Sequence, residues 1–278
     1  MISRIAFLGC GSMGEAILAG LLASGQSPSA VVATSRRAER ADELASRYGI
    51  TAIAGAEEPE ANRQAVKGAD IVLLGVKPAG IADLCREIAP VLSPKSIVIS
   101  VAAAVSLAQL EAALPGGQPV IRSMPNTPLK VRRGVVALSS GTATTAEQLA
   151  MAHEVFTGSG IVLDVPEEQQ NAVSAISGSG PAYTFYLAEA MAAAARDFGL
   201  DGETALILAR ETVAGAGLML SQPGANPTDL RRAVSSPNGT TERAIATFDE
   251  RGLPATISAG AQAAAARAAA MTEELDAG

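Results

Sequence analysis

The chain has 278 residues, of which 48% are hydrophobic and 18% are charged, and its formal net charge at pH 7 is −7. This length and this balance are typical of a folded protein that divides into two domains, and they exclude a disordered chain. The acidic excess argues against a nucleic-acid partner, because proteins that bind phosphate backbones concentrate basic residues on one surface. A small anionic ligand held by a few local groups is still allowed.

Cysteine and histidine are scarce in this sequence. The chain contains two cysteines, Cys10 and Cys85, and one histidine, His153. Their spacing matches no zinc or haem pattern, so we expect no metal site, and a reduced, cytoplasmic protein is the simpler interpretation. The first residues resemble a strand rather than a secretory signal, and the longest apolar stretch, residues 97–110, is too short to span a bilayer. We therefore expect no membrane partner.

The first half of the chain alternates short apolar runs with helical segments. We expect buried strands at residues 4–8, 30–34, 71–75, 96–101 and 119–122. We expect helices between them at residues 12–24, 36–48, 80–91 and 106–114. This alternation predicts right-handed crossovers and a doubly wound, mostly parallel sheet with helices on both faces. Two short strands, at residues 134–138 and 161–163, are expected to extend the sheet around a helix near residues 146–156.

After about residue 165 the strand patterns stop. We expect only helices from there on, at residues 167–177, 181–198, 202–221, 240–251 and 253–275. The sequence therefore predicts an α/β domain over residues 1–165 and an all-α domain over residues 166–278. Alanine-rich stretches at residues 190–195 and 259–270 favour close packing against a partner subunit, although an ordinary alanine-rich core or surface helix would have the same composition.

A glycine-rich hexapeptide, GCGSMG at residues 9–14, fits the pattern G-x-G-x-x-G. It follows the first predicted strand and opens a helix, which is the context that a dinucleotide-binding fingerprint requires. The first glycine permits a tight turn, the second lets the backbone approach a pyrophosphate, and the third allows close packing of helix on strand. The helix start adds free N–H groups and a positive dipole end. A plain glycine turn is the alternative, and the context argues against it.

The residues after the second predicted strand bear on the choice between NAD and NADP. An NAD site usually places an acidic residue there to bind the ribose hydroxyls. This chain has Thr34, Ser35, Arg36 and Arg37 instead, with no acidic residue before Glu39. A hydroxyl and two guanidinium groups suit a 2′-phosphate. NADP is therefore favoured, although paired arginines also occur at the start of ordinary solvent-exposed helices.

Four further segments are candidates for ligand binding. Residues 75–78, GVKP, end another strand at the edge where doubly wound folds bind ligands, although Lys77 is equally explained as a surface residue. Residues 122–128 form a polar, proline-flanked loop, and residues 177–183 interrupt one helix and start another. Residues 235–241 lead into a helix, and their free N–H groups and the helix dipole would make an anion pocket that suits a carboxylate. A capped loop without a ligand is the alternative.

Taken together, these residues resemble the pyrroline-5-carboxylate reductase family, and the resemblance covers nearly the whole chain. The segments that carry it are GCGSMG at 9–14, VKP at 76–78, MPNTP at 124–128, GSGPAY at 178–183 and VSSPNGTT at 234–241. The occurrence of the last three in this order is far more specific than the glycine fingerprint alone.

The resemblance implies an N-terminal Rossmann domain and a C-terminal helical dimerisation domain. It implies a homodimer, with further assembly into a decamer of dimers arranged in a ring, and an active site that the partner subunit completes. The implied reaction transfers a hydride from NADPH, with NADH as an alternative cofactor, to the imine carbon of 1-pyrroline-5-carboxylate. The product is L-proline, and the reaction is the last step of proline synthesis.

The resemblance also implies which residues form the site. The cofactor-binding residues would be Gly9, Gly11, Ser12, Met13, Gly14, Ser35, Arg36, Arg37, Asn62, Val76, Lys77, Pro78, Ala102 and Ala103. The substrate-binding residues would be Ser236, Gly239, Thr240 and Thr241, and the hydroxyl of Thr241 would face the ring nitrogen as the catalytic group. Asn238 stands where members of the family commonly have glycine, and Asn tolerates a positive φ better than most residues.

Two other functions are compatible with parts of the sequence. One is another NADP-dependent imine or β-hydroxyacid reductase on the same two-domain plan. A β-hydroxyacid dehydrogenase would need a catalytic lysine in the helical domain, and no lysine follows Lys130. The other is a sensor that binds NADP(H) without turnover. A sensor would keep the first 100 residues but would not need an anion pocket at residues 234–241.

Overall fold

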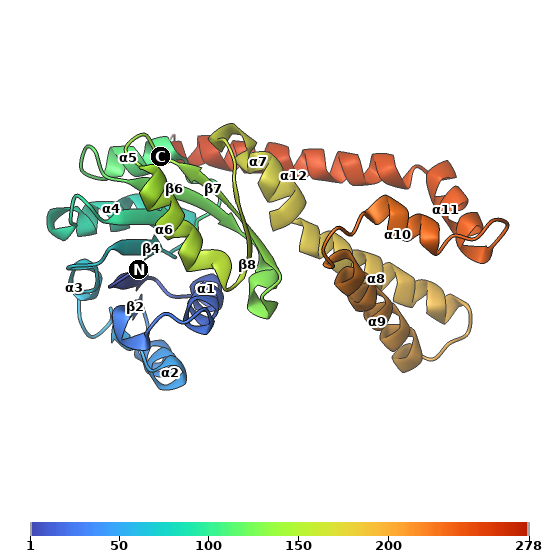
Figure 1. Ribbon diagram of the computed structural model, residues 1–278, viewed down its shortest axis with the longest axis horizontal. Coiled ribbons are helices and arrows are strands. Elements are labelled where there is room, and N and C mark those ends of the chain that lie inside the picture. The colour runs from blue at the N-terminus through green and yellow to red at the C-terminus, as the bar shows by residue number, and fades with distance from the viewer. Residues whose placement is uncertain (1, 277–278) are drawn as a thin grey trace. The chain divides into compact units, whose positions relative to one another are not determined.

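The computed structural model describes residues 2–276. The chain forms two compact units, the first made of Met1–Gly178 and Ala264–Gly278 and the second of Ser179–Ala263. The first unit contains the sheet, and the second is helical (Figure 1). The sequence placed a domain boundary after residue 165, and that boundary stays a prediction.

The first unit is built on one sheet, which within residues 2–276 has eight strands in the order β3-β2-β1-β4-β5-β6-β7-β8. The strands are β1 (Ile5–Leu8), β2 (Val31–Ser35), β3 (Thr51–Ala54), β4 (Ile71–Leu74), β5 (Ile97–Ser100), β6 (Val120–Pro125), β7 (Gly134–Ser140) and β8 (Gly160–Asp164). Neighbouring strands from β3 to β6 run parallel, β7 is antiparallel to β6, and β8 is parallel to β7. The order 3-2-1-4-5-6 is that of a Rossmann fold, so the predicted fold class is confirmed.

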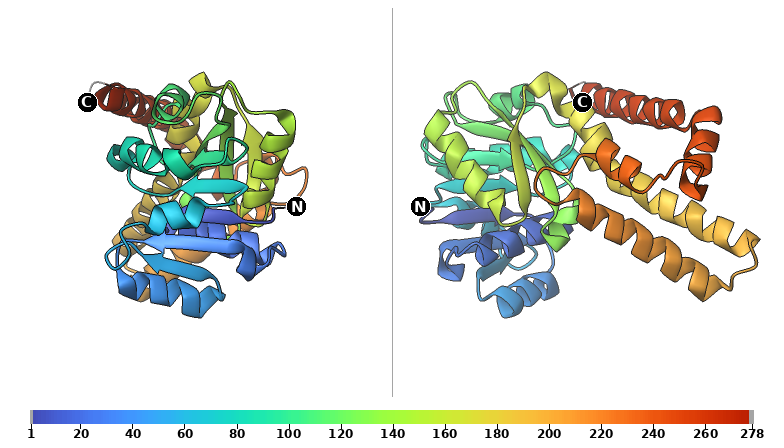
Figure 2. Two further views of the ribbon diagram at one scale, coloured as in Figure 1. Left: turned by 90° about the vertical axis from the view of Figure 1, so that its left-hand side faces the viewer. Right: turned by 45° about the vertical axis from the view of Figure 1, so that its right-hand side comes forward.

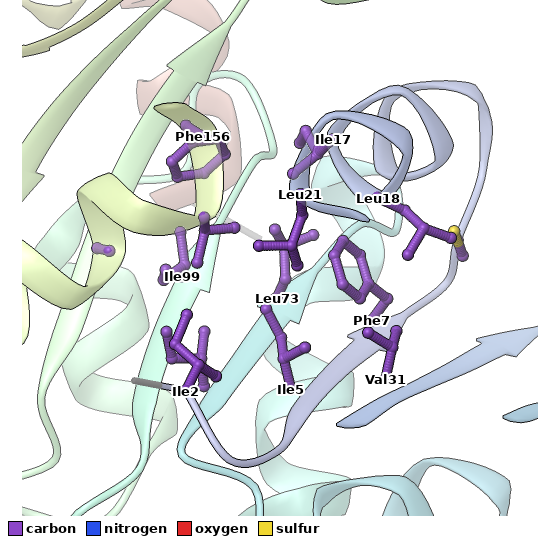
Figure 3. Packing of buried hydrophobic residues seen from close by; sticks show 14 of the residues in the cluster. Ile2, Ile5, Phe7, Ile17, Leu18, Leu21, Val31, Leu73, Ile99 and Phe156 are labelled. Atoms are coloured by element: carbon purple, nitrogen blue, oxygen red, sulfur yellow. The ribbon is translucent and has the colours of Figure 1, made fainter. Parts of the chain in front are cut away.

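Helices cover both faces of this sheet because its strands are apolar on both sides. The helices of the first unit are α1 (Ser12–Ala23), α2 (Ala38–Tyr48), α3 (Ala61–Val66), α4 (Ile81–Ile88), α5 (Leu107–Ala113), α6 (Ala146–Thr157) and α7 (Gln170–Val173). Side chains alternate across a strand, so Phe7 of β1 faces one side of the sheet and Leu8 the other. Figure 3 shows Phe7 packed with Leu18 and Leu21 of α1, and Phe156 of α6 close by.

The opposite face of the sheet packs against α3, α4 and α5. Leu84 and Ile88 of α4 and Leu110 of α5 are buried there, in the same cluster as Leu8. The last helix, α12 (Leu253–Asp276), ends in the first unit, and its Leu275 packs against the same cluster. Burial on both faces explains why the strands are short runs of branched apolar residues rather than alternating patterns.

The second unit contains α8 (Gly180–Asp197), α9 (Gly202–Leu220), α10 (Pro227–Ala233), α11 (Thr240–Glu250) and the first part of α12. Figure 1 and the right-hand view of Figure 2 show α8 and α9 side by side. Large apolar side chains of this pair lie exposed, among them Phe185, Tyr186, Leu206, Leu208 and Met219. An apolar surface of this extent marks an interaction site. No helix within residues 2–276 combines the length and the apolar character that crossing a membrane demands.

Three short elements were not expected from the sequence, namely β3, α3 and α10. The strand β3 lies at the edge of the sheet and is partly exposed, so its four residues show no buried apolar run. The helix α3 has six residues, too few for a clear helical period. The start of α10 did carry a signal, because the Asn226 side chain accepts hydrogen bonds from two first-turn N–H groups and Pro227 follows it.

The loop expected at residues 122–128 is in part a strand, so that prediction is wrong for its first half. The strand β6 continues to Pro125, because Met124 pairs with Ala137 and Pro125 with Val136 of the antiparallel β7. The apolar pattern of the sequence shows where the buried part of β6 ends, but it does not show that pairing with β7 continues the strand.

A cluster of charged side chains fixes α2 against α1. The carboxylate of Glu15 accepts hydrogen bonds from Arg40 at 2.5 Å, from Arg47 at 2.8 Å and from the Tyr48 hydroxyl at 3.0 Å. Burial alone would raise the pKa of Glu15, but these three hydrogen bonds outweigh it and lower the pKa below its ordinary value. The ionised form of Glu15 therefore stabilises the folded state.

We expect Glu15→Gln to lower the free energy of unfolding by about 2 kcal/mol at pH 7, because Arg40 loses a charged partner in a largely buried position. The folded-state pKa of Glu15 is depressed, so its contribution is present above the unfolded-state pKa and is lost as the pH falls through the folded-state value. Urea denaturation at several pH values should show the difference between the two proteins shrinking as the pH falls below about 4.3, the ordinary pKa of glutamate. Asp83→Asn, which breaks an exposed ion pair with Arg86, is the control. A constant difference at every pH would contradict the assignment.

Candidate active site

The glycine turn after β1 packs directly against the loop after β4. Gly9 has a φ of +74°, and a Cβ built there would lie 2.5 Å from Cγ1 of Val76. A Cβ on Gly75 would in turn lie 2.9 Å from the carbonyl oxygen of Gly9. The two segments that the sequence assigned to the cofactor, residues 9–14 and 76–78, are therefore in contact, at the point where the strand order reverses.

The start of α1 is open to an anion. Its N-cap is Gly11, and the structure of residues 2–276 shows no side chain that caps it. Its first residues, Ser12, Met13 and Gly14, therefore present N–H groups at the positive end of the helix dipole. A Cβ on Gly14 would lie 3.4 Å from Sγ of Cys10, which is an ordinary contact. This turn and helix start fit the pyrophosphate of a dinucleotide, because a backbone cradle without capping side chains leaves the N–H groups free for phosphate oxygens.

The end of β2 presents two exposed arginines, Arg36 and Arg37. The hydroxyl of buried Ser35 donates a hydrogen bond of 2.8 Å to the carbonyl oxygen of Arg37, and the N–H of Ala56 binds the carbonyl oxygen of Arg36 at 3.1 Å. These bonds fix the backbone on which both guanidinium groups are carried. Neither guanidinium group forms an ion pair with any other part of residues 2–276, and two such groups at the carboxyl end of this strand fit a 2′-phosphate.

Asn62 lies in α3, beside the glycine turn. Its Oδ1 accepts a hydrogen bond of 2.7 Å from the Thr34 hydroxyl, and its Nδ2 donates one of 3.1 Å to Glu87. The Thr34 hydroxyl accepts from the N–H of Gly9 at 3.1 Å. The sequence proposed Asn62 as a cofactor residue but did not anticipate that Thr34 connects it to Gly9.

The remaining predicted cofactor residues follow the strands next to β1. Lys77 is exposed and Pro78 half-buried after β4, while Ala102 is buried and Ala103 half-buried after β5. All four therefore lie at the carboxyl edge of the sheet with the glycine turn.

The helix expected at residues 167–177 is broken, so that prediction is wrong in detail. Glu167–Gln169 form a 3-10 turn, α7 has four residues, and Ser174–Gly178 form a π-helix that leads into α8. Single π-helical turns inside helices occur frequently at functional sites. A sequence period cannot reveal one inserted residue in a helix, which is why a continuous helix was expected.

Two of the family motifs contact one another through this π-helix. The amide of Asn126 donates hydrogen bonds of 3.1 Å to both the carbonyl oxygen and the hydroxyl of Ser177, and its Oδ1 accepts from the N–H of Val135 at 2.9 Å. A Cβ on Gly178 would lie 2.5 Å from Cε of Met124. The MPNTP and GSGPAY segments are thus joined, a contact that the sequence did not predict.

The predicted substrate loop lies in the second unit and forms a tight turn. The N–H of Gly239 binds the carbonyl oxygen of Ser236 at 2.9 Å, and Asn238 has a φ of +57°. The N–H of Asn238 donates to the carboxylate of Glu242 at 2.6 Å. A Cβ on Gly239 would lie 2.9 Å from the backbone carbonyl oxygen of Ser236, so this position needs glycine. Pro237 at the second position and a left-handed third residue are those of a type II turn.

The helix α11 starts directly from this turn without a capping side chain. Its N-cap is Gly239, and no side chain within residues 2–276 binds its first N–H groups as a cap. The two preceding helices differ, because Asp201 caps α9 and Asn226 caps α10. Thr240 and Thr241 occupy the first two helical positions, so their N–H groups are presented at this end of the helix. This end of α11 can bind a carboxylate.

Cysteine and histidine often carry chemistry, and here Cys10 lies in the glycine turn while Cys85 and His153 lie outside the segments described above. Burial raises the pKa of both Cys10 and Cys85 to about 12, so neither thiol is a nucleophile at neutral pH. His153 of α6 contacts Asp164 of β8, with 2.7 Å between Nε2 and Oδ1. Within residues 2–276, no group of three His, Cys, Asp or Glu side chains is placed to hold a metal ion.

This fold and these segments define a Rossmann oxidoreductase that uses NADP, followed by a helical dimerisation domain. Residues 4–104 match the family model of NADP oxidoreductase, coenzyme F420-dependent, and residues 167–271 match that of pyrroline-5-carboxylate reductase dimerisation. The chain is 39% identical to the pyrroline-5-carboxylate reductase of Pseudomonas aeruginosa over 98% of both chains. It is 40% identical to that of Corynebacterium melassecola over 96% of this chain and 97% of the other. The chain belongs to the pyrroline-5-carboxylate reductase family.

Solved structures agree with this assignment. The chain resembles a pyrroline-5-carboxylate reductase from Coxiella burnetii with a TM-score of 0.91 and 35% identity, over 97% of this chain and 98% of the other. The fold is also that of the Plasmodium falciparum pyrroline carboxylate reductase with NADP bound, with a TM-score of 0.81 and 22% identity over 97% and 98%.

We expect Gly9→Ala to weaken NADPH binding at least tenfold, because a Cβ at this φ is strained and also collides with Val76. Gly68→Ala is the matched control, since Gly68 has a φ of +70° but nothing within 4 Å of an added Cβ. Fluorescence titration with NADPH measures both variants. If Gly9→Ala bound NADPH as tightly as Gly68→Ala does, the glycine turn would not be the pyrophosphate cradle.

Proposed function

We propose that this protein reduces 1-pyrroline-5-carboxylate to L-proline with NADPH, as the last step of proline biosynthesis. The observation that carries the proposal is the uncapped glycine turn at Ser236–Thr241, which suits a small carboxylate and stands in a family match over nearly the whole chain. A sensor of NADP(H) would not need this second anion site.

In the proposed reaction, the bound cofactor supplies the hydride from C4 of its nicotinamide. The chain's own part is to hold the two reactants. The start of α1 would bind the pyrophosphate, and the turn before α11 would bind the substrate carboxylate through the N–H groups of Thr240 and Thr241. The Thr241 hydroxyl would hydrogen-bond the ring nitrogen. Water can protonate the imine, so no histidine is needed. Holding both reactants in the correct orientation lowers the activation barrier of hydride transfer by several kcal/mol.

The decisive experiment follows NADPH absorbance when pyrroline-5-carboxylate is added to the purified protein. NADH and a six-membered cyclic imine with a carboxylate are run in parallel. Rapid oxidation that depends on the five-membered substrate would support the proposal. A folded protein that binds NADPH but oxidises it with neither imine would contradict it and favour a sensor.

We also propose that the protein acts as a homodimer, assembled further into a decamer of dimers arranged in a ring, in the cytoplasm. The exposed apolar residues of α8 and α9 and the match to a dimerisation domain support the dimer. The two buried free thiols are typical of a reducing compartment. Light scattering tests the assembly directly, and a monomer at micromolar concentration would contradict it.

The proposed 2′-phosphate site predicts a change in cofactor preference. We expect the double variant with Arg36→Ala and Arg37→Ala to raise the KM for NADPH about tenfold or more, because two charged hydrogen-bond donors are lost. The KM for NADH should stay within about twofold. Arg86→Ala, which removes an exposed guanidinium of α4, is the control. An equal loss for both cofactors would contradict the assignment.

The proposed role of Thr241 is to orient the substrate. We expect Thr241→Ala to lower kcat about tenfold, which corresponds to one lost hydrogen bond, without abolishing turnover. Thr241→Ser keeps the hydroxyl and should restore most of the rate. Complete loss of activity in a folded Thr241→Ala variant that still binds NADPH would show that the hydroxyl does more than orient.

A further inference from the structure

A series of hydrogen bonds runs from Glu87 in α4, through Asn62 in α3 and Thr34 in β2, to the glycine turn after β1. The carboxylate of Glu87 in α4 accepts from Nδ2 of Asn62 at 3.1 Å, and Oδ1 of Asn62 accepts from the Thr34 hydroxyl at 2.7 Å. The Thr34 hydroxyl then accepts from the N–H of Gly9 at 3.1 Å. We call these three side chains the Thr34–Asn62–Glu87 series.

The donor and acceptor roles within this series are set by its charged end, the carboxylate of Glu87. A carboxylate only accepts hydrogen bonds, so Glu87 requires the NH₂ side of the Asn62 amide to face it. The oxygen of Asn62 must then face Thr34, and it uses the single hydroxyl proton of Thr34. Only a lone pair of the Thr34 oxygen is left, and it is directed to the N–H of Gly9. Every group in the series therefore has one consistent role.

Thr34 is the buried end of the series and binds the turn twice. Its side chain is almost fully buried, its hydroxyl accepts from Gly9, and its carbonyl oxygen accepts from the N–H of Cys10 at 2.8 Å. Gly9 is held at a φ of +74° against Val76, so an unsatisfied N–H there would cost free energy in a place that is already constrained.

We propose that Thr34, Asn62 and Glu87 are positioning residues that hold the glycine turn in its pyrophosphate-binding shape, an inference that rests on the proposed cofactor site. The resemblance implies that Asn62 contacts the cofactor, and its hydrogen bonds in addition connect it to Gly9 through Thr34. Since the pyrophosphate is common to NADPH and NADH, a substitution in this series weakens the binding of both cofactors equally. Changes at Arg36 and Arg37, by contrast, would affect NADPH alone.

The first test uses Thr34→Val, which keeps the shape of the side chain and removes the hydroxyl. Binding of NADPH and of NADH is measured by fluorescence titration without substrate. We expect both Kd values to rise about tenfold, in the range for one lost buried hydrogen bond. Thr34→Ser keeps the hydroxyl and should bind within about twofold of the wild type. Ser96→Ala is the control. It removes a buried hydroxyl that donates a hydrogen bond to the carbonyl oxygen of Ala69 at the amino ends of the strands, opposite the glycine turn.

The second test reverses the chemistry of Asn62. Asn62→Asp has the same shape but sets a carboxylate against Glu87, so we expect the Kd of both cofactors to rise about tenfold. Adding Glu87→Gln supplies an NH₂ group that can donate to the new carboxylate, which still accepts from Thr34. The double variant should therefore recover most of the lost affinity for both cofactors.

Several outcomes would overturn the inference. Wild-type affinity of Thr34→Val for both cofactors would do so, and so would a loss limited to NADPH or a double variant as weak as Asn62→Asp. If Thr34→Val did not fold, the Asn62 and Glu87 variants would decide. These titrations contain no substrate, so a wild-type protein that binds NADPH but does not reduce pyrroline-5-carboxylate would refute the proposed reaction alone.

Discussion

The left-handed turn at Gly9 is the constraint on which the cofactor half of the structure depends. It brings the ends of β1 and β4 so close that a Cβ would touch Val76, while Thr34 at the end of β2 binds the same turn from the other side. The strand order 2-1-4 is what places these three strand ends next to one another. The reversal of strand order brings these loops together, and their close packing in turn requires a glycine at position 9. As a result, the N–H groups at the start of α1 are exposed to a ligand.

The sequence predicted the parts of this arrangement that depend on local patterns. Strands buried on both faces appear as continuous apolar runs, and the glycine turn is recognisable because it lies between such a run and a helix. The bonds that complete the site could not be predicted, since Thr34 and Asn62 are 28 residues apart and Asn126 and Ser177 are 51 apart. Such pairs meet only through packing of the whole unit. The short β3 and α3 were missed because they are too small to show a period.

The second unit shows how a substitution of an expected glycine can be accommodated. Asn238 occupies a left-handed position where the resemblance implies a glycine, and its N–H donates a hydrogen bond to Glu242 in the first turn of α11. Gly239 next to it has an ordinary φ but no room for a Cβ beside Ser236. The two positions therefore have different requirements. Position 238 needs a residue that tolerates a positive φ, and position 239 needs a residue without a Cβ. The resemblance identified the turn, but only the structure separates these two requirements.

Two of the proposed anion sites are built from peptide N–H groups at helix starts, α1 after Gly11 and α11 after Gly239. Peptide groups do not titrate, so their ability to attract an anion stays the same at every pH at which the protein is folded. An acidic protein can thus hold negatively charged ligands without recruiting a histidine or a lysine whose charge changes near neutrality. Any response of binding to a drift in cellular pH would then originate in the ionisation of the ligands themselves, and the protein would be a passive, constant partner.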